Sequence, residues 1–76
     1  MNKNRRKTIS EIADRITGLK TDIEIVRDEE QEAYDALPES LQGGDKGQAM
    51  QSAIDALENA INSLDEVESS LEEAGN

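Results

Sequence analysis

The stretch TISEIADRITGLKTDIEIV, residues 8–26, decides the fold, because its apolar residues recur at alternating spacings of three and four. The same spacing continues to Leu37 with one gap, at Glu30. A pattern of this kind is typical of a coiled-coil helix and of few other structures. Its apolar positions are Ile9, Ile12, Ile16, Leu19, Ile23, Val26, Ala33 and Leu37.

The ends of this helix follow from local signals. Thr8 begins a capping box, although a start near Asn2 or Asn4 is equally allowed. Pro38 disfavours helical geometry at the residue before it, so the helix should stop near that point. We therefore predict a first helix over 8–37.

A second apolar pattern fills the end of the chain. Asp45 is a candidate N-cap, which predicts a helix over 46–74. Small residues in one of its rows would let an antiparallel helix approach closely. Two rows recur every seven residues: Met50, Leu57, Leu64 and Leu71, and beside them Ala53, Ala60, Val67 and Ala74.

The hinge between the helices covers 38–45, where Gly43 and Gly44 would allow the chain to reverse direction. We expect Leu41 to fold back onto the helix ends. Two helices of matched length joined by a short hinge predict an all-α fold, an antiparallel coiled-coil-like helical hairpin. The prediction is a single domain over 1–76.

A lone hairpin would leave much of its apolar surface exposed. The apolar stripes are three positions wide, Ile25 lies outside the seam, and the chain has a single aromatic residue with which to build a core. We therefore predict a homo-oligomer, most simply a dimeric four-helix bundle. Glu30 would then either set the register or lie exposed where the seam ends.

The composition excludes most chemistry. The chain has no His and no Cys, so no His base, no thiol nucleophile and no ordinary site for a metal or other cofactor is expected, and we do not predict an enzyme. The glycine-rich hinge lacks the spacing of a phosphate-binding loop. The acidic run over 28–35 is interpreted as a solvated helix face. With a net charge of −10, direct nucleic-acid binding is not expected. Lacking a signal peptide or an apolar span, the protein is expected in the cytoplasm, without a membrane partner.

Four cations stand apart from this acidity, in an N-terminal arm over 1–7 that contains no acid. A hairpin would bring them beside the acidic end of the second helix, where Glu68, Glu72 and Glu73 could neutralise them. Alternatively, an oligomer could gather them into a pocket for a phosphorylated ligand, since arginines bind phosphate bidentately. These residues, called the basic cluster below, are Lys3, Arg5, Arg6 and Lys7.

Tyr34 is a further candidate for such a pocket, because it could stack on a base. It lies near the hinge, some 40 Å from the arginines at ~1.5 Å per helical residue. It could join them only across an antiparallel partner, and packing at the edge of the seam is the alternative interpretation. The candidate ligand-binding residues are thus Arg5, Arg6, Lys7 and Tyr34.

Several motifs together resemble a family of small acidic proteins from prophages and mobile elements of Gram-positive bacteria. They are NKNRRK at 2–7 with Glu11-Ile12, DEEQEAYDALPESLQ at 28–42, and LENA at 57–60 with Ser63-Leu64. The resemblance spans essentially the whole chain, and its most specific part is LPESLQ. It departs from the family at Ala36, where an Asn is usual. The family has no assigned activity, so the resemblance implies only a context, that of a phage accessory protein.

These observations lead to two functional hypotheses. The first is a non-enzymatic inhibitor of host defence whose homo-oligomer sequesters an anionic nucleotide signal in pockets lined by Arg5, Arg6 and Lys7. The alternative is an acidic decoy that binds a host protein through the acids of the second helix, or a purely structural coiled-coil adaptor whose charges only confer solubility.

Overall fold

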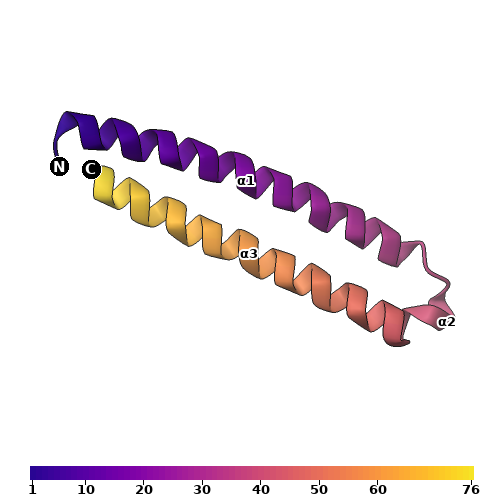
Figure 1. The fold of residues 1–76 in the computed structure, drawn as a ribbon. Helices are drawn as coiled ribbons and strands as arrows, with labels where there is room; N and C mark the ends of the chain where they lie inside the picture. The colour runs from indigo at the N-terminus through magenta and orange to yellow at the C-terminus, as the bar shows by residue number, and fades with distance from the viewer.

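The computed structural model describes all 76 residues, which form two long antiparallel helices joined by a short one (Figure 1). The long helices are α1 (Lys3–Asp35) and α3 (Asp45–Gly75), and α2 (Glu39–Gln42) lies in the hinge. The Cα trace measures 58 × 15 × 12 Å, so the molecule is a narrow rod. The predicted all-α helical hairpin is confirmed, and both termini lie at the same end of it.

Helix α1 begins earlier than the capping box indicates. Asn2 is the N-cap, and its Oδ1 accepts a hydrogen bond of 2.8 Å from the backbone N–H of Arg5. Thr8 lies inside the helix, where its hydroxyl donates to the carbonyl of Asn4. The residues predicted as an N-terminal arm are therefore mostly the first turns of α1. The basic cluster is held on rigid helix rather than on a flexible tail.

The hinge is organised by Gln42. Its amide nitrogen donates to the carbonyl of Tyr34 at 3.2 Å, which also accepts the backbone N–H of Leu37, and to the carbonyl of Leu37 at 3.4 Å, just beyond the end of α1. Pro38 is the N-cap of α2. Leu41 does not fold back onto the helix ends as expected, since it is 53% exposed.

The start of α3 depends on Gly47 rather than on the predicted cap. The N-cap is Gly44, without a side-chain hydrogen bond, and Asp45 is already helical. Gly43 and Gly44 both have ordinary negative φ angles. Gly47 is buried, and a Cβ at this position would overlap the backbone of Gln42. Close approach of α3 to α2, not an unusual backbone angle, is what requires glycine here.

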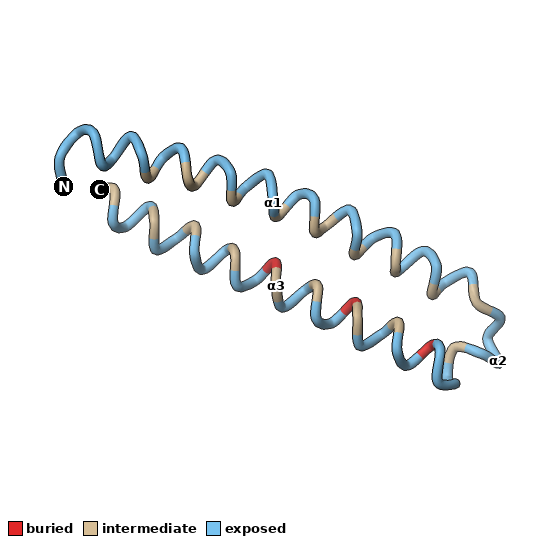
Figure 2. The backbone as a smooth tube through the Cα atoms, in the orientation of Figure 1, coloured by how far each residue is buried: buried red, intermediate tan, exposed pale blue.

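The core of the single chain is thin. Only two hydrophobic side chains are buried, Ile54 at 7% and Ile61 at 8% exposure, both on α3 (Figure 2). No residue of α1 is buried. Leu19 and Val26, which the spacing placed in the seam, are 55% and 52% exposed. The coiled-coil stripe of α1 is thus only partly turned toward α3, and its remainder faces outward.

Candidate functional site

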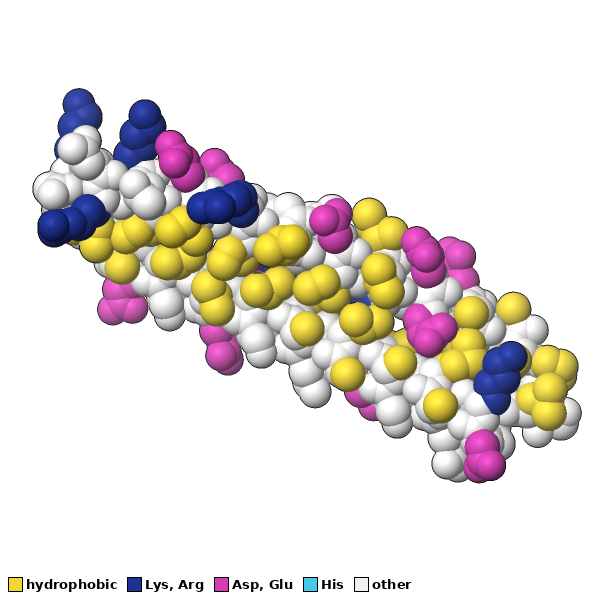
Figure 3. Space-filling view, viewed as in Figure 1, with side chains coloured by type: hydrophobic (Ala, Val, Ile, Leu, Met, Phe, Trp, Pro, Cys, Tyr) yellow, Lys and Arg dark blue, Asp and Glu magenta, His cyan; other side chains and the backbone are white.

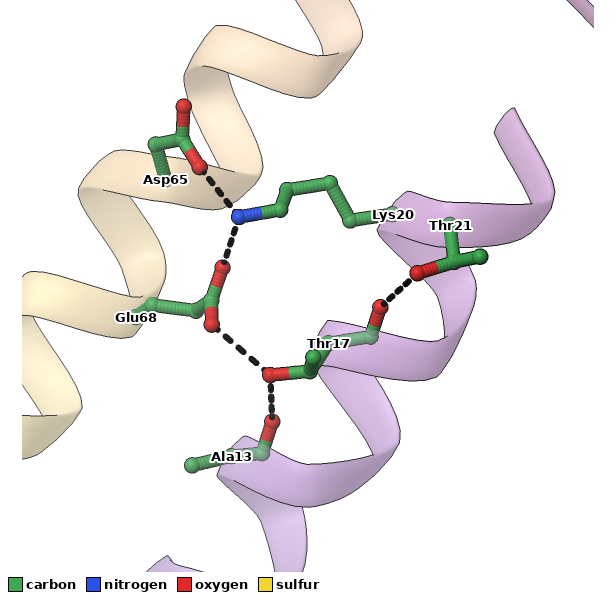
Figure 4. A network of polar contacts seen from close by, with 6 residues as sticks. All are labelled: Ala13, Thr17, Lys20, Thr21, Asp65 and Glu68. Carbon is green, nitrogen blue, oxygen red and sulfur yellow. Dashed lines mark hydrogen bonds and ion pairs between the residues drawn. The ribbon is translucent and has the colours of Figure 1, made fainter. Parts of the chain in front are cut away.

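One face of the hairpin is held together by polar contacts between α1 and α3 (Figure 4). Lys20 Nζ lies 2.5 Å from Asp65 Oδ1 and 2.7 Å from Glu68 Oε1. The Thr17 hydroxyl donates to the second oxygen of Glu68 at 2.8 Å. Nearer the hinge, Gln51 Nε2 donates to the Tyr34 hydroxyl at 2.9 Å. We call this side of the hairpin the polar face.

These contacts shift two pKa values. Hydrogen bonds to Asp65 and then to Glu68 raise the pKa of Lys20 well above its ordinary value. The hydrogen bond from Lys20, followed by the one from Thr17, lowers the pKa of Glu68. Both groups therefore stay charged through the neutral range.

The network involves residues that the sequence did not single out as a group. Glu68 was expected to neutralise the basic cluster, and instead it pairs with Lys20 of the same chain. The available signal was the place of Lys20 beside the apolar seam, since a cation there faces the acidic second helix across the pair. Ion pairs of this kind fix the two helices relative to each other and do not by themselves indicate a catalytic or binding site.

The basic cluster lies on the first turns of α1, at the end of the rod where the chain begins. All four of its residues are exposed, and none of them forms an ion pair with Glu72, Glu73 or any other acid. The first turn of α1 contains no acid at all. Because the positive end of the helix dipole lies there, these cations are electrostatically unfavourable as they stand. Figure 3 shows Lys and Arg side chains gathered at this end of the rod.

A shallow groove of about 340 Å³ adjoins the cluster between the ends of α1 and α3. Arg6 is its one basic residue, whereas Glu68 and Glu72 both line it. An anion in this groove would meet more carboxylates than guanidinium groups. The single chain therefore places Arg5, Arg6 and Lys7 on the first turns of α1, but only Arg6 lines the groove, and the chain does not by itself form an anion pocket.

The structure does not bring Tyr34 to the other candidate residues. Tyr34 is half-buried near the hinge on the polar face, where it lines a second groove with Gln31, Gln51, Ile54, Asp55 and Glu58. That groove contains two carboxylates and no cation. The Tyr34 hydroxyl already accepts a hydrogen bond from Gln51. Edge packing, the alternative interpretation of Tyr34, agrees better with this position.

The face opposite the polar face carries a continuous band of apolar side chains along both helices (Figure 3). We call this band the apolar stripe. Residues seven apart share a face of a helix, so each helix contributes one outer row. The outer rows are Ile12, Leu19, Val26 and Ala33 on α1, and Ala53, Ala60, Val67 and Ala74 on α3. Val67, at 40% exposure, stands out with Leu19 and Val26 among the exposed large hydrophobic residues.

No group of three or more acidic side chains is arranged to hold a metal ion. Neither long helix has the length and apolar content needed to cross a membrane.

Comparison of the chain with protein-family models, with curated proteins and with solved structures finds no match. The resemblance to small phage proteins therefore stays a prediction.

Proposed function

We propose that this chain is a non-enzymatic accessory protein of a phage or mobile element that sequesters an anionic nucleotide signal of host defence in its host's cytoplasm. Arg5, Arg6 and Lys7, gathered from several copies in a homo-oligomer, would hold the phosphate groups. The observation that supports this proposal is the basic cluster without a single ion pair, placed where the helix dipole opposes cations. A bound phosphate would remove that electrostatic cost.

The surrounding charges support a need for more than one chain. The groove beside the cluster holds two carboxylates for its one arginine, so one copy offers an anion little net attraction. Where copies meet, Arg5 and Lys7, which do not line this groove, would join Arg6 around the phosphate. Guanidinium groups can then bind phosphate oxygens in pairs, which gives both affinity and orientation. The phage context rests on the sequence resemblance alone.

Titration calorimetry with cyclic dinucleotides, cyclic mononucleotides and cyclic ADP-ribose relatives tests the proposal. We expect at least one of them to bind, and Arg5→Glu with Arg6→Glu to weaken it more than tenfold while helicity is kept. The matched control is Arg15→Glu with Lys46→Glu, which changes the net charge equally away from the cluster. Absence of heat with every ligand, from folded wild-type protein, would rule out nucleotide sequestration. An equal loss in the control would reduce the effect to general electrostatics.

The acids of α3 favour a second candidate, an acidic decoy or adaptor for a host protein. Asp65 and Glu68 are paired with Lys20, whereas Asp55, Glu58, Glu66, Glu72 and Glu73 have no ion pair. A partner with a basic nucleic-acid-binding surface would suit such a row of charges. Capture from host lysate at low salt, lost at high salt and lost when these acids become amides, is the expected result. Capture that persists in the amide variant would contradict it.

A further inference from the structure

The chain exposes more surface than a compact protein of its mass. A folded monomer of 8.3 kDa exposes about 4,600 Å². This hairpin exposes 5501 Å². The difference is close to the ~800 Å² that each partner buries in a protein interface of standard size. The excess is what one face of the rod would lose if another chain covered it.

The apolar stripe is the face that needs such a cover. The polar face satisfies its groups within the chain, through the contacts of Lys20, Thr17 and Tyr34. The stripe has no such partners and includes three large side chains that are 40% to 55% exposed, Leu19, Val26 and Val67. Two buried isoleucines form too small a core to hold long helices together in water, because packing supplies most of the stability of helices.

We propose that a second copy of this chain covers the apolar stripe, in a dimeric four-helix bundle whose two basic clusters lie at the same end. The inference rests on the homo-oligomer of the proposed function and does not depend on its ligand. The two-fold axis runs along the rod, so α1 of each copy lies on α3 of the other. Every helix is then antiparallel to both of its neighbours, as in up-down four-helix bundles.

The sizes of the side chains favour this arrangement. Contacts between Thr17 and Glu68 and between Lys20 and Asp65 set the levels of the two helices. At the same register, Leu19 lies level with Val67, and Val26 lies level with Ala60. The larger row of α1 therefore meets the smaller row of α3 in the partner. In the reverse arrangement the two-fold axis crosses the rod, so α1 packs on α1 and α3 on α3, and the two basic clusters lie at opposite ends. The large row would then meet the large row and the small row the small one, which packs the two sides of the bundle at unequal distances.

Charge favours the same arrangement. Helix α3 carries eight acids and a single cation, Lys46, so two α3 helices packed on each other would repel along their length. In the proposed bundle α3 instead meets α1 of the partner, whose first half contains the basic cluster and Arg15. At the end of the rod where the chain begins, cations of α1 then lie near acids of α3 from both copies, which favours this arrangement over one that packs α3 on α3.

The bundle would also double the basic cluster at one end of the rod. The two clusters together supply eight cations there, from Lys3, Arg5, Arg6 and Lys7 of each copy. This is the gathering of arginines that the single chain lacks. An anion that bridges the two copies would stabilise the dimer, so ligand and assembly would reinforce each other.

The first test is association of the ligand-free protein, measured by sedimentation equilibrium. We expect a dimer that Val26→Glu weakens more than tenfold. The matched control is Ile25→Glu, because Ile25 is equally exposed at 51% but lies off the stripe, and it should leave the dimer intact. Should Val26→Glu unfold the chain, Val26→Ala should still lower the association constant. A fully helical monomer at high micromolar concentration, or equal losses in both glutamate variants, would overturn the proposal.

The second test is the orientation, measured by electron–electron distances between spin labels. The chain has no Cys, so one introduced cysteine labels one site per copy. Asn4→Cys and Ser40→Cys should each give a short distance across the bundle, within about three helix spacings of 8–10 Å. The reverse arrangement would separate the Asn4 labels by about 55 Å at 1.5 Å per residue. Asp22→Cys, near the middle of the rod, should give a short distance in either case. Long distances at both ends would overturn the orientation, whatever calorimetry shows for nucleotides.

Discussion

Lys20 Nζ lies 2.7 Å from Glu68 Oε1 and so joins the middle of α1 to the last third of α3. Glu68 also accepts the Thr17 hydroxyl, and Lys20 also reaches Asp65, so four side chains meet at one level of the hairpin. Sliding one helix by a single residue would turn these groups away from one another. The apolar contacts of Ile and Leu are less demanding, because neighbouring turns offer similar surfaces. The polar network is therefore what sets the register of the two helices.

The network should make part of the stability depend on pH. Hydrogen bonds from Lys20 and Thr17 hold the pKa of Glu68 below its ordinary 4.5. A carboxyl with a lowered folded pKa stabilises the fold above its unfolded pKa and loses that contribution as the pH falls through the folded value. We therefore expect wild type to be more stable than Glu68→Gln at pH 6, and the gap to close below about pH 4.5. Urea unfolding of both proteins from pH 7 to pH 3 measures it.

The comparison with Glu68→Gln isolates this effect from the general one. Acid also discharges the remaining carboxylates of a chain with net charge −10, which relieves repulsion in both proteins alike. Only the difference between them reports the Glu68 contacts. A constant difference across the whole range would show that the contacts do not form in solution. At the alkaline end, the contribution of Lys20 should be present in full below its ordinary pKa of 10.5 and be lost as the pH rises from there toward its raised pKa.

The hairpin could be predicted from sequence because its signals are periodic and local. Leu19 and Val26 repeat with the heptad, and Pro38 stops α1 regardless of what packs nearby. Which part of the stripe faces α3 could not be predicted, because the same rows can pack within a chain or between chains. That choice depends on side chains such as Lys20. Its ion pairs with α3 turn one side of α1 toward that helix and leave Leu19 and Val26 facing outward. The partner of Glu68 was missed for the same reason, since Lys20 and the basic cluster were both plausible partners for it.

Gly47 should be the one hinge glycine that cannot change. A Cβ at Gly47 would overlap the backbone of Gln42, and backbone cannot move aside as a side chain can. We expect Gly47→Ala to lower the free energy of unfolding by about 1–3 kcal/mol, the usual cost of overpacking. Chemical denaturation followed by circular dichroism provides the measurement.

Gly43→Ala is the matched control for this substitution. Nothing lies within 4 Å of a Cβ at Gly43, and its φ of −84° suits any residue. Alanine there should raise stability by about 0.4–1 kcal/mol by restricting the unfolded chain. If both substitutions had the same effect, the close packing of α3 on α2 would be absent in solution.

Tyr34 should not contribute to ligand binding. It lies near the hinge, on the polar face, and the proposed bundle leaves it far from both basic clusters. Tyr34→Leu keeps apolar volume and removes the ring and hydroxyl, so it should leave nucleotide affinity within twofold and cost about 0.5–1.5 kcal/mol of stability through the lost Gln51 hydrogen bond. Calorimetry and urea unfolding measure the two effects. An affinity loss of tenfold would place Tyr34 at the site and require the reverse orientation of the two copies.

Removing Arg5 and Arg6 should stabilise the folded protein while it weakens nucleotide binding. Arg5 and Arg6 lie in the first turn of α1, at the positive end of its dipole, and form no ion pair. Arg5→Gln with Arg6→Gln should raise the free energy of unfolding by about 0.3–1 kcal/mol per residue at low salt, while nucleotide binding falls. The control is Arg15→Gln, compared with Arg5→Gln alone, because it makes the same change in net charge away from the first turn of a helix and should not stabilise. Urea unfolding of ligand-free protein separates the two interpretations of the cluster. If Glu72 and Glu73 neutralise it in solution, the arginine variant will be less stable than wild type, since it will have lost its attraction to them. A gain in stability together with a loss of binding is the result expected of cations kept for a ligand rather than for the fold.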